Sequence, residues 1–383
     1  MSFFWFNDTI FKSYLRAKYK NDHITEHDFG DLNYQKLHKL NQCFSSRPWG
    51  LQHDISNHIP HPFDIKTKTA YEFSNEPRTF GDVCLDTAQT ISRMTDRIIA
   101  VFWSGGIDST AALVALLQTI PMQQLVVVCN QASIDEFPSF YEHKIKDRVK
   151  VISPRLYLQH YRDFFSVTGD GGDTVWGVID ETFWQSNSHK INLPWQDCID
   201  QSVLPDIDFV QEFCTWSGKE IKSWLELRVW FYLCCKWQDK CMRPYYLRCN
   251  VSPKDIVPFY DIDRSFQNWT MNNLDLIIGK RWVDYKIPAK EFMFRYHNDA
   301  DYLRYKSKVG SIYFDFYNCD NGQTRTEWPT LDLQSHYRIA VHEDFVDFPL
   351  SSWPFVDYAE IEDFNDQFGL IPSRIVSPLD SDQ

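Results

Sequence analysis

The stretch from residue 98 to residue 117 constrains the fold more than any other part of the chain. It begins with a short β-branched and aromatic run, residues 98–102, which predicts a buried strand. A turn with the sequence Ser-Gly-Gly-Ile-Asp-Ser follows at residues 104–109. The residues after it are rich in Ala and Leu, and no helix breaker occurs before Pro121. We therefore expect a strand, a glycine-rich turn and a helix in direct succession.

The turn has the features of an anion-binding site. Gly105 and Gly106 have no Cβ, so the backbone can approach a ligand closely. The following helix directs its free N–H groups and its positive dipole end towards the same place. Ser104 and Ser109 add hydroxyl donors, and the Asp108 carboxylate can hold Mg²⁺ against phosphate oxygens. A purely structural, serine-rich turn is the alternative. No Gly-Lys-Ser/Thr follows the glycines, which excludes a Walker-type loop.

This stretch resembles the pyrophosphate loop (PP-loop) of the N-type ATP pyrophosphatases, which cleave ATP to AMP and pyrophosphate. The resemblance implies that ATP and Mg²⁺ are bound here. It implies that Asp108 is a metal ligand and that the nucleotide contacts include Ser104, Gly105, Gly106, Asp108 and Ser109.

The strand and helix signals alternate further along the chain. A helix at residues 82–97 leads into the central strand, and later strands are expected at residues 125–129, 149–152 and 164–168, with a helix at 133–145. Strands separated by helices at this spacing predict an α/β fold with a doubly wound parallel sheet. Ligands bind such sheets at the carboxyl ends of the strands. Val128 and Gly169, at two of these ends, are therefore expected to contact the nucleotide.

A second glycine-rich turn, at residues 168–177, narrows the resemblance. It is similar to the Ser-Gly-Glu-Gly-x-Asp-Glu-x-Phe-Gly-Gly turn of the asparagine synthetase family. Asp173 matches that family's second metal-binding aspartate, and Asp170 matches its active-site glutamate. Thr174 stands where the family has another glutamate. A structural Asp-Gly turn is the alternative.

Two later segments also resemble this family. Residues 256–261 are similar to its Arg-Val-Pro-Phe-Leu-Asp motif, which implies that Asp261 faces the nucleotide, although Ile256 replaces the arginine. Without the resemblance, this segment is a turn before a helix N-cap. Residues 286–292 are similar to the family's Leu-Pro segment. Residues 306–311 resemble its Arg-x-Lys-x-Gly-Phe stretch, which implies that Lys308 stabilises developing negative charge. A solvated surface lysine is the alternative there.

Together, these motifs imply the synthetase domain of the asparagine synthetase family, with an adenine nucleotide alpha hydrolase-like fold and a helical C-terminal half. Its reaction activates a carboxylate as an acyl-adenylate, which an amine then attacks to form an amide. The implied catalytic residues are Asp170, Asp261 and Lys308, and Asp108 and Asp173 share Mg²⁺. The segment before the PP-loop is shorter than the family's N-terminal glutaminase domain. The nitrogen is therefore expected to come from ammonia, a substrate amine or a separate glutaminase subunit.

Two other functions remain as alternatives: a tRNA-modifying PP-loop enzyme, and a catalytically inactive nucleotide-binding partner protein. The formal net charge of −13 argues against a nucleic-acid surface, and the ten cysteines include no Cys-x-x-Cys pair. The aspartates at 108, 173 and 261 argue against an inactive protein, which does not need to keep such carboxylates.

The expected organisation is a helical and loop region at 1–80, the ATP-binding core at 81–180, a mainly helical substrate region at 181–340 and an acidic, aromatic strap at 341–383. A dense apolar helix at 219–233 is expected in the helical part, buried as core. We expect the six histidines from His23 to His61 to be loop residues rather than metal ligands. We likewise expect buried thiols rather than a metal site for Cys198, Cys214, Cys241 and Cys249. No apolar run is long enough to span a membrane, and the N-terminus lacks a signal peptide, so a cytoplasmic protein is expected.

Overall fold

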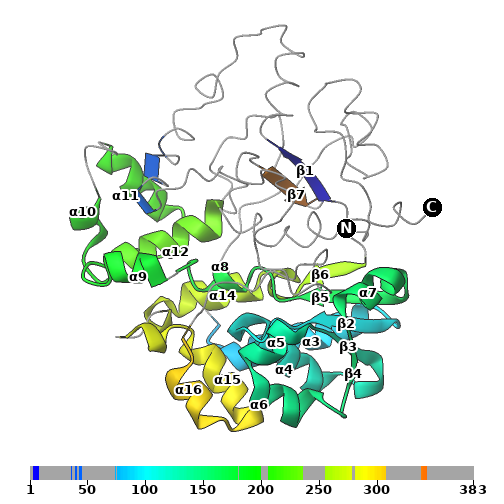
Figure 1. Cartoon of the computed structure of the whole chain (residues 1–383). Helices are drawn as coiled ribbons and strands as arrows, with labels where there is room; N and C mark the ends of the chain where they lie inside the picture. Colours follow the sequence, from blue (N-terminus) through cyan, green and yellow to red (C-terminus); the bar gives the residue numbers. More distant parts are fainter. Residues whose placement is uncertain are drawn as a thin grey trace, which may run out of the picture. The chain divides into compact units, whose positions relative to one another are not determined.

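Figure 1 shows a computed structural model of the chain. It describes residues 3–7, 36, 39–40, 43–44, 74, 76–179, 181–199, 206–235, 255–277, 281–307 and 338–342. Several sequence predictions lie outside these residues: most of the helical and loop region at 1–80 with its six histidines, Lys308, Cys241, Cys249 and the acidic part of the C-terminal strap.

The chain forms two compact units, each assembled from separate segments. The first unit described below contains residues 73–191 and 240–323. The other contains residues 1–72, 192–239 and 324–383. Both glycine-rich turns, at residues 104–109 and 168–177, belong to the first unit.

A parallel sheet of five strands forms the centre of the first unit (Figure 1). Its spatial order is β4-β3-β2-β5-β6. The chain passes from β2 outwards through β3 to β4, then crosses back to place β5 on the other side of β2. This order is consistent with a doubly wound α/β fold, and it confirms the predicted parallel sheet. The strands are β2 (Ile98–Phe102), β3 (Leu125–Val128), β4 (Lys150–Ile152), β5 (Phe164–Thr168) and β6 (Ile256–Pro258).

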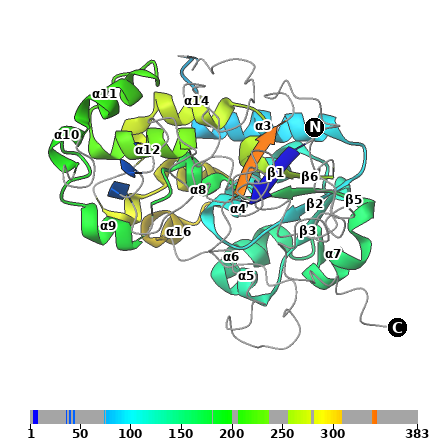
Figure 2. The ribbon, with the colours of Figure 1, turned by 90° about the horizontal axis from the view of Figure 1, so that it is seen from above.

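Helices surround this sheet, and α3, α4 and α15 pack against one another. Figure 2 shows α14 lying beside α3, in agreement with their contacts. The helices of this unit are α3 (Phe80–Met94), α4 (Ile107–Thr119), α5 (Gln131–Glu136), α6 (Pro138–Phe140), α7 (Pro154–His160), α8 (Gly172–Val175), α9 (Glu181–Asn187), α14 (Ser265–Asn272), α15 (Ile287–His297) and α16 (Ala300–Tyr305).

Two predicted helices differ from the structure at their ends or in their continuity. Helix α3 begins two residues earlier than predicted because Thr79 and Asp82 form a capping box. The single helix predicted at 133–145 is wrong, since α5, α6 and a π-helical turn at Tyr141–Ile145 replace it. Pro138 has no N–H, and it disfavours helical geometry at Phe137, so the helix is interrupted there.

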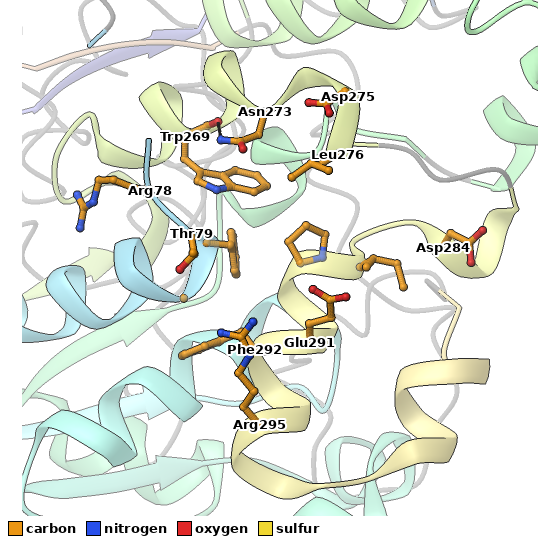
Figure 3. A pocket seen from close by; sticks show the side chains of 14 residues that line it. Arg78, Thr79, Trp269, Asn273, Asp275, Leu276, Asp284, Glu291, Phe292 and Arg295 are labelled. Carbon is orange, nitrogen blue, oxygen red and sulfur yellow. Dashed lines mark hydrogen bonds between the residues drawn. The ribbon is translucent and has the colours of Figure 1, made fainter. Parts of the chain in front are cut away.

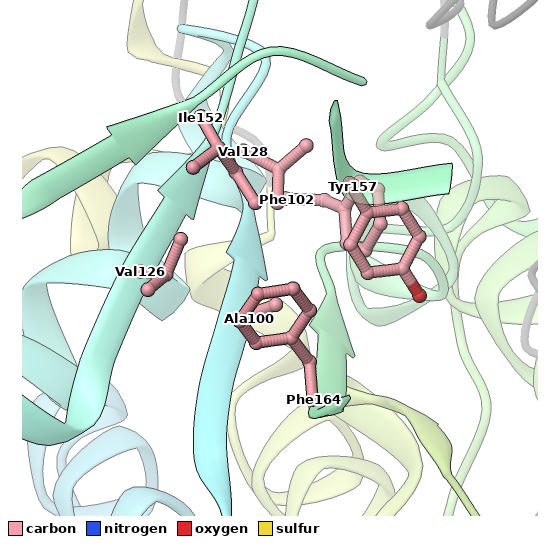
Figure 4. Close-up of a cluster of buried hydrophobic side chains, with 7 residues drawn as sticks. All are labelled: Ala100, Phe102, Val126, Val128, Ile152, Tyr157 and Phe164. Carbon is pink, nitrogen blue, oxygen red and sulfur yellow. The ribbon is translucent and has the colours of Figure 1, made fainter. Parts of the chain in front are cut away.

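One face of the sheet is covered by α7 (Figure 4). Alternate residues of β2, Ala100 and Phe102, point to this face and join a buried cluster with Val126, Val128, Ile152, Tyr157 and Phe164. The Phe102 and Tyr157 rings meet edge to face, with centroids 4.7 Å apart. The Tyr157 hydroxyl also forms a hydrogen bond of 2.7 Å with the Ser166 hydroxyl in β5. Helix α7 is thereby fixed to both strands on which the two glycine-rich turns depend.

At the edge where the strands begin, one guanidinium joins three of them. Arg97, immediately before β2, forms an ion pair with Asp255, immediately before β6. Its other terminal nitrogen donates to the carbonyl oxygens of Arg162 and Phe164 at the start of β5. Because the guanidinium offers several donors in a fixed plane, one side chain serves all three strands. This clamp lies at the opposite end of the strands from the glycine-rich turns.

The other unit contains a short antiparallel pair and a group of helices. Strand β1 (Phe3–Asn7) pairs with β7 (Arg338–His342), and the helices are α10 (Trp195–Cys198), α11 (Ile207–Thr215) and α12 (Trp224–Cys235). The predicted burial of the dense apolar helix is confirmed, because α12 buries most of its side chains all round. The Trp230 indole of α12 donates to the Phe213 carbonyl of α11 at 2.9 Å.

Membrane insertion can be assessed for the helices that the structure describes. Among them, none is both long enough and apolar enough to cross a bilayer.

The cluster under α7 makes a direct prediction about stability. Phe102→Ala should lower the free energy of unfolding by about 3–5 kcal/mol, because it leaves a cavity between β2 and α7. Ile98→Ala, in the same strand, removes a side chain that is 40% exposed and should cost less than about 1 kcal/mol. Urea denaturation of both variants measures the difference, and equal losses would contradict the buried role of Phe102.

Candidate functional site

The two glycine-rich turns lie next to each other in space. The first glycine-rich turn (residues 104–109) follows β2 and the second turn follows β5, and these two strands are paired neighbours. The strand order reverses between them, since β3 and β4 continue from β2 in the other direction. In open α/β sheets, ligands bind at the carboxyl ends of the strands at such a switch point. Motifs about sixty residues apart in the sequence therefore form one candidate site.

The first glycine-rich turn is ordered by its own serines. The hydroxyls of Ser104 and Ser109 lie 2.8 Å apart in a hydrogen bond, and the Ser109 hydroxyl also accepts from the Ser104 N–H at 3.1 Å. Gly105 has a φ of +76°, which favours glycine. Gly106 is the N-cap of α4 and offers no side chain to cap its first N–H groups. The positive end of a helix of 13 residues therefore begins in the loop without a side-chain cap.

The second turn contacts the first glycine-rich turn through Gly169 and Gly172. A Cβ on Gly172 would lie 2.6 Å from Cβ and Cγ of Asp108 and 2.9 Å from Cε2 of Tyr260. A Cβ on Gly169 would lie 2.9 Å from Cα of Ser109. Real Cβ atoms do not approach other atoms this closely. The glycines therefore allow the second turn to touch the loop, which places Asp173 beside Asp108.

A lysine that the motifs did not assign lies between these two aspartates. The Lys286 ammonium donates to Asp108 Oδ2 at 2.5 Å and to Asp173 Oδ1 at 2.8 Å. The Lys286 side chain is only 1% exposed, and the two aspartate side chains are 19% and 28% exposed. Lys286 is the N-cap of α15 and has a left-handed backbone with φ of 62°. The start of α15 thus delivers one buried positive charge to the two predicted metal ligands.

The charge on Lys286 depends on these neighbours. Burial by itself favours the neutral amine, but the carboxylates of Asp108 and Asp173 outweigh this effect and raise the pKa of Lys286 above its ordinary value. The ammonium is therefore charged at neutral pH. Two carboxylates directed at one positive centre are also a donor set that suits Mg²⁺, because hard cations prefer oxygen ligands. The residues present fit the predicted metal.

Tyr260 fixes the backbone at Asp108, in the first glycine-rich turn. It belongs to a 3₁₀ turn at Phe259–Asp261 that follows β6, and its hydroxyl donates to the Asp108 carbonyl at 2.8 Å. Burial and the nearby Asp108 charge raise the pKa of Tyr260, so its hydroxyl keeps its proton. The predicted site residue Asp261 ends this turn and is partly exposed.

A second lysine lies close to the first glycine-rich turn. Lys306, the first lysine of the Lys-Ser-Lys segment, forms an ion pair with Glu136 at the end of α5, and both side chains are about 15% exposed. Glu136 in turn adjoins Gly105, because a Cβ on that glycine would lie 2.7 Å from the Glu136 Cβ. Lys290 of α15 donates to the Lys306 carbonyl at 3.1 Å. The predicted catalytic residue Lys308 lies two positions beyond Lys306, outside the described residues.

Other predicted residues have defined positions. Asp170 is partly exposed, and its N–H donates to the Thr168 hydroxyl at 3.3 Å. The Val128 side chain belongs to the cluster under α7, while its carbonyl accepts from the Trp103 N–H at 3.0 Å. Thr174 and Ile256, which depart from the family pattern, are both fully buried.

Lys286, Tyr260 and Gly172 are the residues whose roles the sequence motifs did not assign. A single lysine among apolar neighbours, directly before the Ile-Pro that begins a helix, is the signal that points to Lys286. A cation in such a segment needs a buried anionic partner. The sequence does not identify that partner, since 178 positions separate Lys286 from Asp108.

Metal-ligating and thiol side chains in the described part of the chain add two facts. No cluster of three or more His, Cys, Asp or Glu side chains that could hold a metal occurs among the described residues. Cys129 follows β3, and burial raises its pKa to about 12. Its thiol is therefore neutral near pH 7 and is not a sulfur nucleophile there.

No model of a known protein family matches the chain, and no curated protein is similar enough in sequence to be aligned with it. The functional argument therefore depends on the motifs and on the geometry of this site.

The contact between the two turns predicts an unequal response to alanine. Gly172→Ala should cost about 1–3 kcal/mol of unfolding free energy, because the new methyl overlaps Asp108. Gly106→Ala should cost less, since a Cβ there meets only the Ser104 hydroxyl at 3.3 Å. Thermal unfolding compares the variants. If both glycines tolerate alanine equally, the two turns are not in the contact described here.

The Lys286 ammonium predicts a metal-dependent change in stability. Lys286→Met should lower the free energy of unfolding by about 3–5 kcal/mol, because it leaves two partly buried carboxylates facing each other. Added Mg²⁺ should restore more stability to this variant than to the wild type, since the ion replaces the lost charge.

The matched control is Lys222→Met, which removes an exposed lysine paired with Glu220 and should leave the stability nearly unchanged, without Mg²⁺ dependence. The contribution of the Lys286 ion pairs to the free energy of unfolding depends on pH. Because its pKa is raised in the folded protein, the contribution is complete below the ordinary lysine value of 10.5 and is lost as the pH rises above it. Insensitivity of Lys286→Met to Mg²⁺ would contradict the shared carboxylate site.

Proposed function

We propose that this chain is an asparagine synthetase-like, ATP-dependent carbon–nitrogen ligase that forms AMP. It would adenylate a carboxylate, release pyrophosphate and transfer ammonia or a substrate amine to form an amide. The observation that carries the proposal is the meeting of Asp108 and Asp173, from two separate motifs, around the buried ammonium of Lys286. The resemblance of both motifs to the PP-loop ligases supports the chemistry.

In this proposal, Asp108 and Asp173 would hold Mg²⁺. When bound, the ion would withdraw charge from the phosphate oxygens and so favour attack at the α-phosphorus. The loop serines and the uncapped N–H groups of α4 would hold the pyrophosphate oxygens. Lys286 and Lys306 add positive charge on two sides of the loop, where negative charge grows as pyrophosphate leaves.

The proposed reaction has two bond-forming steps, which require different side chains. First, a carboxylate oxygen forms a bond to the α-phosphorus while the bond to the bridging oxygen of pyrophosphate breaks. Next, an amine nitrogen forms a bond to the acyl carbon, loses a proton and displaces AMP. The partly exposed Asp170 at the second turn is the candidate to orient the substrates or accept that proton. Asp261 and Lys308 remain proposed site residues from the resemblance.

The tRNA-modifying alternative receives no support from Cys129, because its buried thiol is neutral.

The inactive-partner alternative differs from the proposal in one measurable property. An inactive protein would bind ATP without producing AMP, whereas the ligase produces AMP and pyrophosphate in equal amounts.

Turnover with ATP, Mg²⁺, ammonium and a pool of carboxylates that includes aspartate tests the proposal. Wild-type protein should release AMP and pyrophosphate, and Asp108→Asn should lower the rate by about a hundredfold or more, because it weakens charge stabilisation at the phosphates. Quantification of AMP by chromatography and of pyrophosphate by a coupled assay measures both products.

The matched control is Asp163→Asn, an exposed aspartate on the short 3₁₀ turn before β5, which should keep the wild-type rate. ATP binding is measured in parallel with a fluorescent analogue. A wild-type protein that binds no ATP and releases no pyrophosphate would contradict the proposal. Binding without turnover of any carboxylate would favour the inactive-partner alternative.

A further inference from the structure

Lys290 is a buried lysine whose hydrogen-bond partners are uncharged. Its side chain on α15 is 0% exposed, and its ammonium donates to the carbonyl oxygens of Val283 and Lys306. It forms no ion pair within the described part of the chain. The carboxylate that influences it most, Asp284, is paired with Arg281. A buried charge normally has an anionic partner, so packing alone does not account for a lysine at this position.

Lys290 lies on the buried side of α15, away from the exposed face of this helix. Figure 3 shows the exposed face, where Glu291 and Arg295 border a cavity of about 430 Å³ that Lys290 does not line. On the buried side, Lys286 lies one turn before Lys290 and pairs with the two aspartates of the candidate site. The two buried lysines of α15 therefore have different partners, which are carboxylates for Lys286 and carbonyl groups for Lys290.

The two carbonyl groups that Lys290 binds belong to different segments. Val283 lies in the 3₁₀ turn Trp282–Asp284 before α15, whereas Lys306 is the C-cap of α16. Carbonyl groups at the end of a helix lack a partner within the helix. The Lys290 ammonium supplies one, because it can donate up to three hydrogen bonds. Lys290 thus fixes the backbone at the point where the chain leaves α16.

The backbone at Lys306 in turn determines where its ammonium lies. That ammonium pairs with Glu136, whose side chain adjoins the first glycine-rich turn. One turn earlier in α16, the Tyr302 ring stacks on Phe137, with ring centroids 3.8 Å apart. The end of α16 is therefore held through its backbone by Lys290 and through its side chains by residues 136 and 137.

We propose that Lys290 is a positioning residue for the first glycine-rich turn. By holding the Lys306 carbonyl, it keeps the Lys306 ammonium beside this turn, where that charge assists the binding of pyrophosphate oxygens. Lys290 itself is fully buried and acts only through Lys306. The identity of the anion rests on the proposed function, whereas the coupling between Lys290 and Lys306 does not.

The hold on Lys306 depends on pH in a defined direction. Burial lowers the pKa of Lys290 to about 8, an effect that Asp284 opposes and Arg281 reinforces. The neighbouring ammonium groups of Lys286 and Lys306 are already paired with carboxylates. The bond to the Lys306 carbonyl is therefore charge-assisted below about pH 8 and weakens above it, as the Lys290 ammonium loses its proton.

The free energy of unfolding moves in the opposite direction over this range. Because the pKa of Lys290 is lowered in the folded protein, the unfolded chain binds more protons between about pH 8 and the ordinary lysine value of 10.5. The contribution of Lys290 to stability thus becomes more favourable as the pH rises. A weaker hold on Lys306 at high pH can therefore be distinguished from a general loss of stability.

Pyrophosphate binding tests the proposal with paired variants. Isothermal titration of the full chain with inorganic pyrophosphate and Mg²⁺ compares Lys290→Met with the wild type. Lys290→Met should bind about fivefold more weakly near pH 7, and the difference should shrink to less than about twofold near pH 9.5. The ratio of the two affinities at each pH cancels the titration of pyrophosphate itself. In a Lys306→Met background, Lys290→Met should cause no further loss, because it acts through the ammonium that is already absent.

A second measurement needs no ligand. A double-mutant cycle of Lys306→Met and Glu136→Gln measures the coupling between these side chains in the free energy of unfolding. In a Lys290→Met background this coupling should fall by about half or more, because the Lys306 backbone is no longer held. The matched control background is Lys146→Met, which removes an exposed lysine paired with Glu142 and should leave the coupling unchanged.

Three results would overturn the proposal. These are an unchanged coupling between Lys306 and Glu136 in Lys290→Met, a loss of pyrophosphate affinity that is equal with and without the Lys306 ammonium, and a loss that does not depend on pH. A wild-type protein that binds no pyrophosphate would instead contradict the proposed function, and the cycle without ligand would still decide the role of Lys290.

Discussion

The buried ammonium of Lys286 is the interaction on which the candidate site depends. Two carboxylates at adjacent strand ends repel each other, and the repulsion is stronger where protein replaces water. Lys286 compensates both, at 2.5 Å from Asp108 and 2.8 Å from Asp173. Its position is fixed by the backbone, since it is the N-cap of α15 and a proline follows in the first turn. The fold thus holds a site of high charge density before any ligand is bound.

The main chain, rather than side-chain rotamers, sets how close the two turns come. Gly169 and Gly172 place the second turn against Ser109 and Asp108. Tyr260 holds the Asp108 carbonyl from β6, the strand beyond β5. Three neighbouring strands therefore contribute to the position of one carboxylate. Such preorganisation is what charge stabilisation requires, because little has to move when charge develops.

The parts of the site that could be predicted from the sequence are the local ones. The strand, turn and helix around Asp108 are encoded in adjacent residues, and the parallel sheet follows from their alternation with later segments. The presence of Asp108 and Asp173 at one edge of the sheet was also predictable, because parallel β–turn–helix units place their turns at the same edge.

What could not be predicted depends on contacts between distant segments. Lys286 lies 178 positions from Asp108, and no local pattern specifies which anion it meets. The grouping of residues 73–191 with 240–323 is likewise a property of the folded chain. The interruption at Phe137 has a local signal, because Pro138 follows it and disfavours helical geometry at Phe137.

The Arg97 clamp has a consequence for how this protein can change over evolutionary time. It joins the beginnings of β2, β5 and β6, whereas the glycine-rich turns follow the ends of β2 and β5. Substitutions in the turns leave the contacts of the clamp intact, so the sheet can persist while the residues of the turns change.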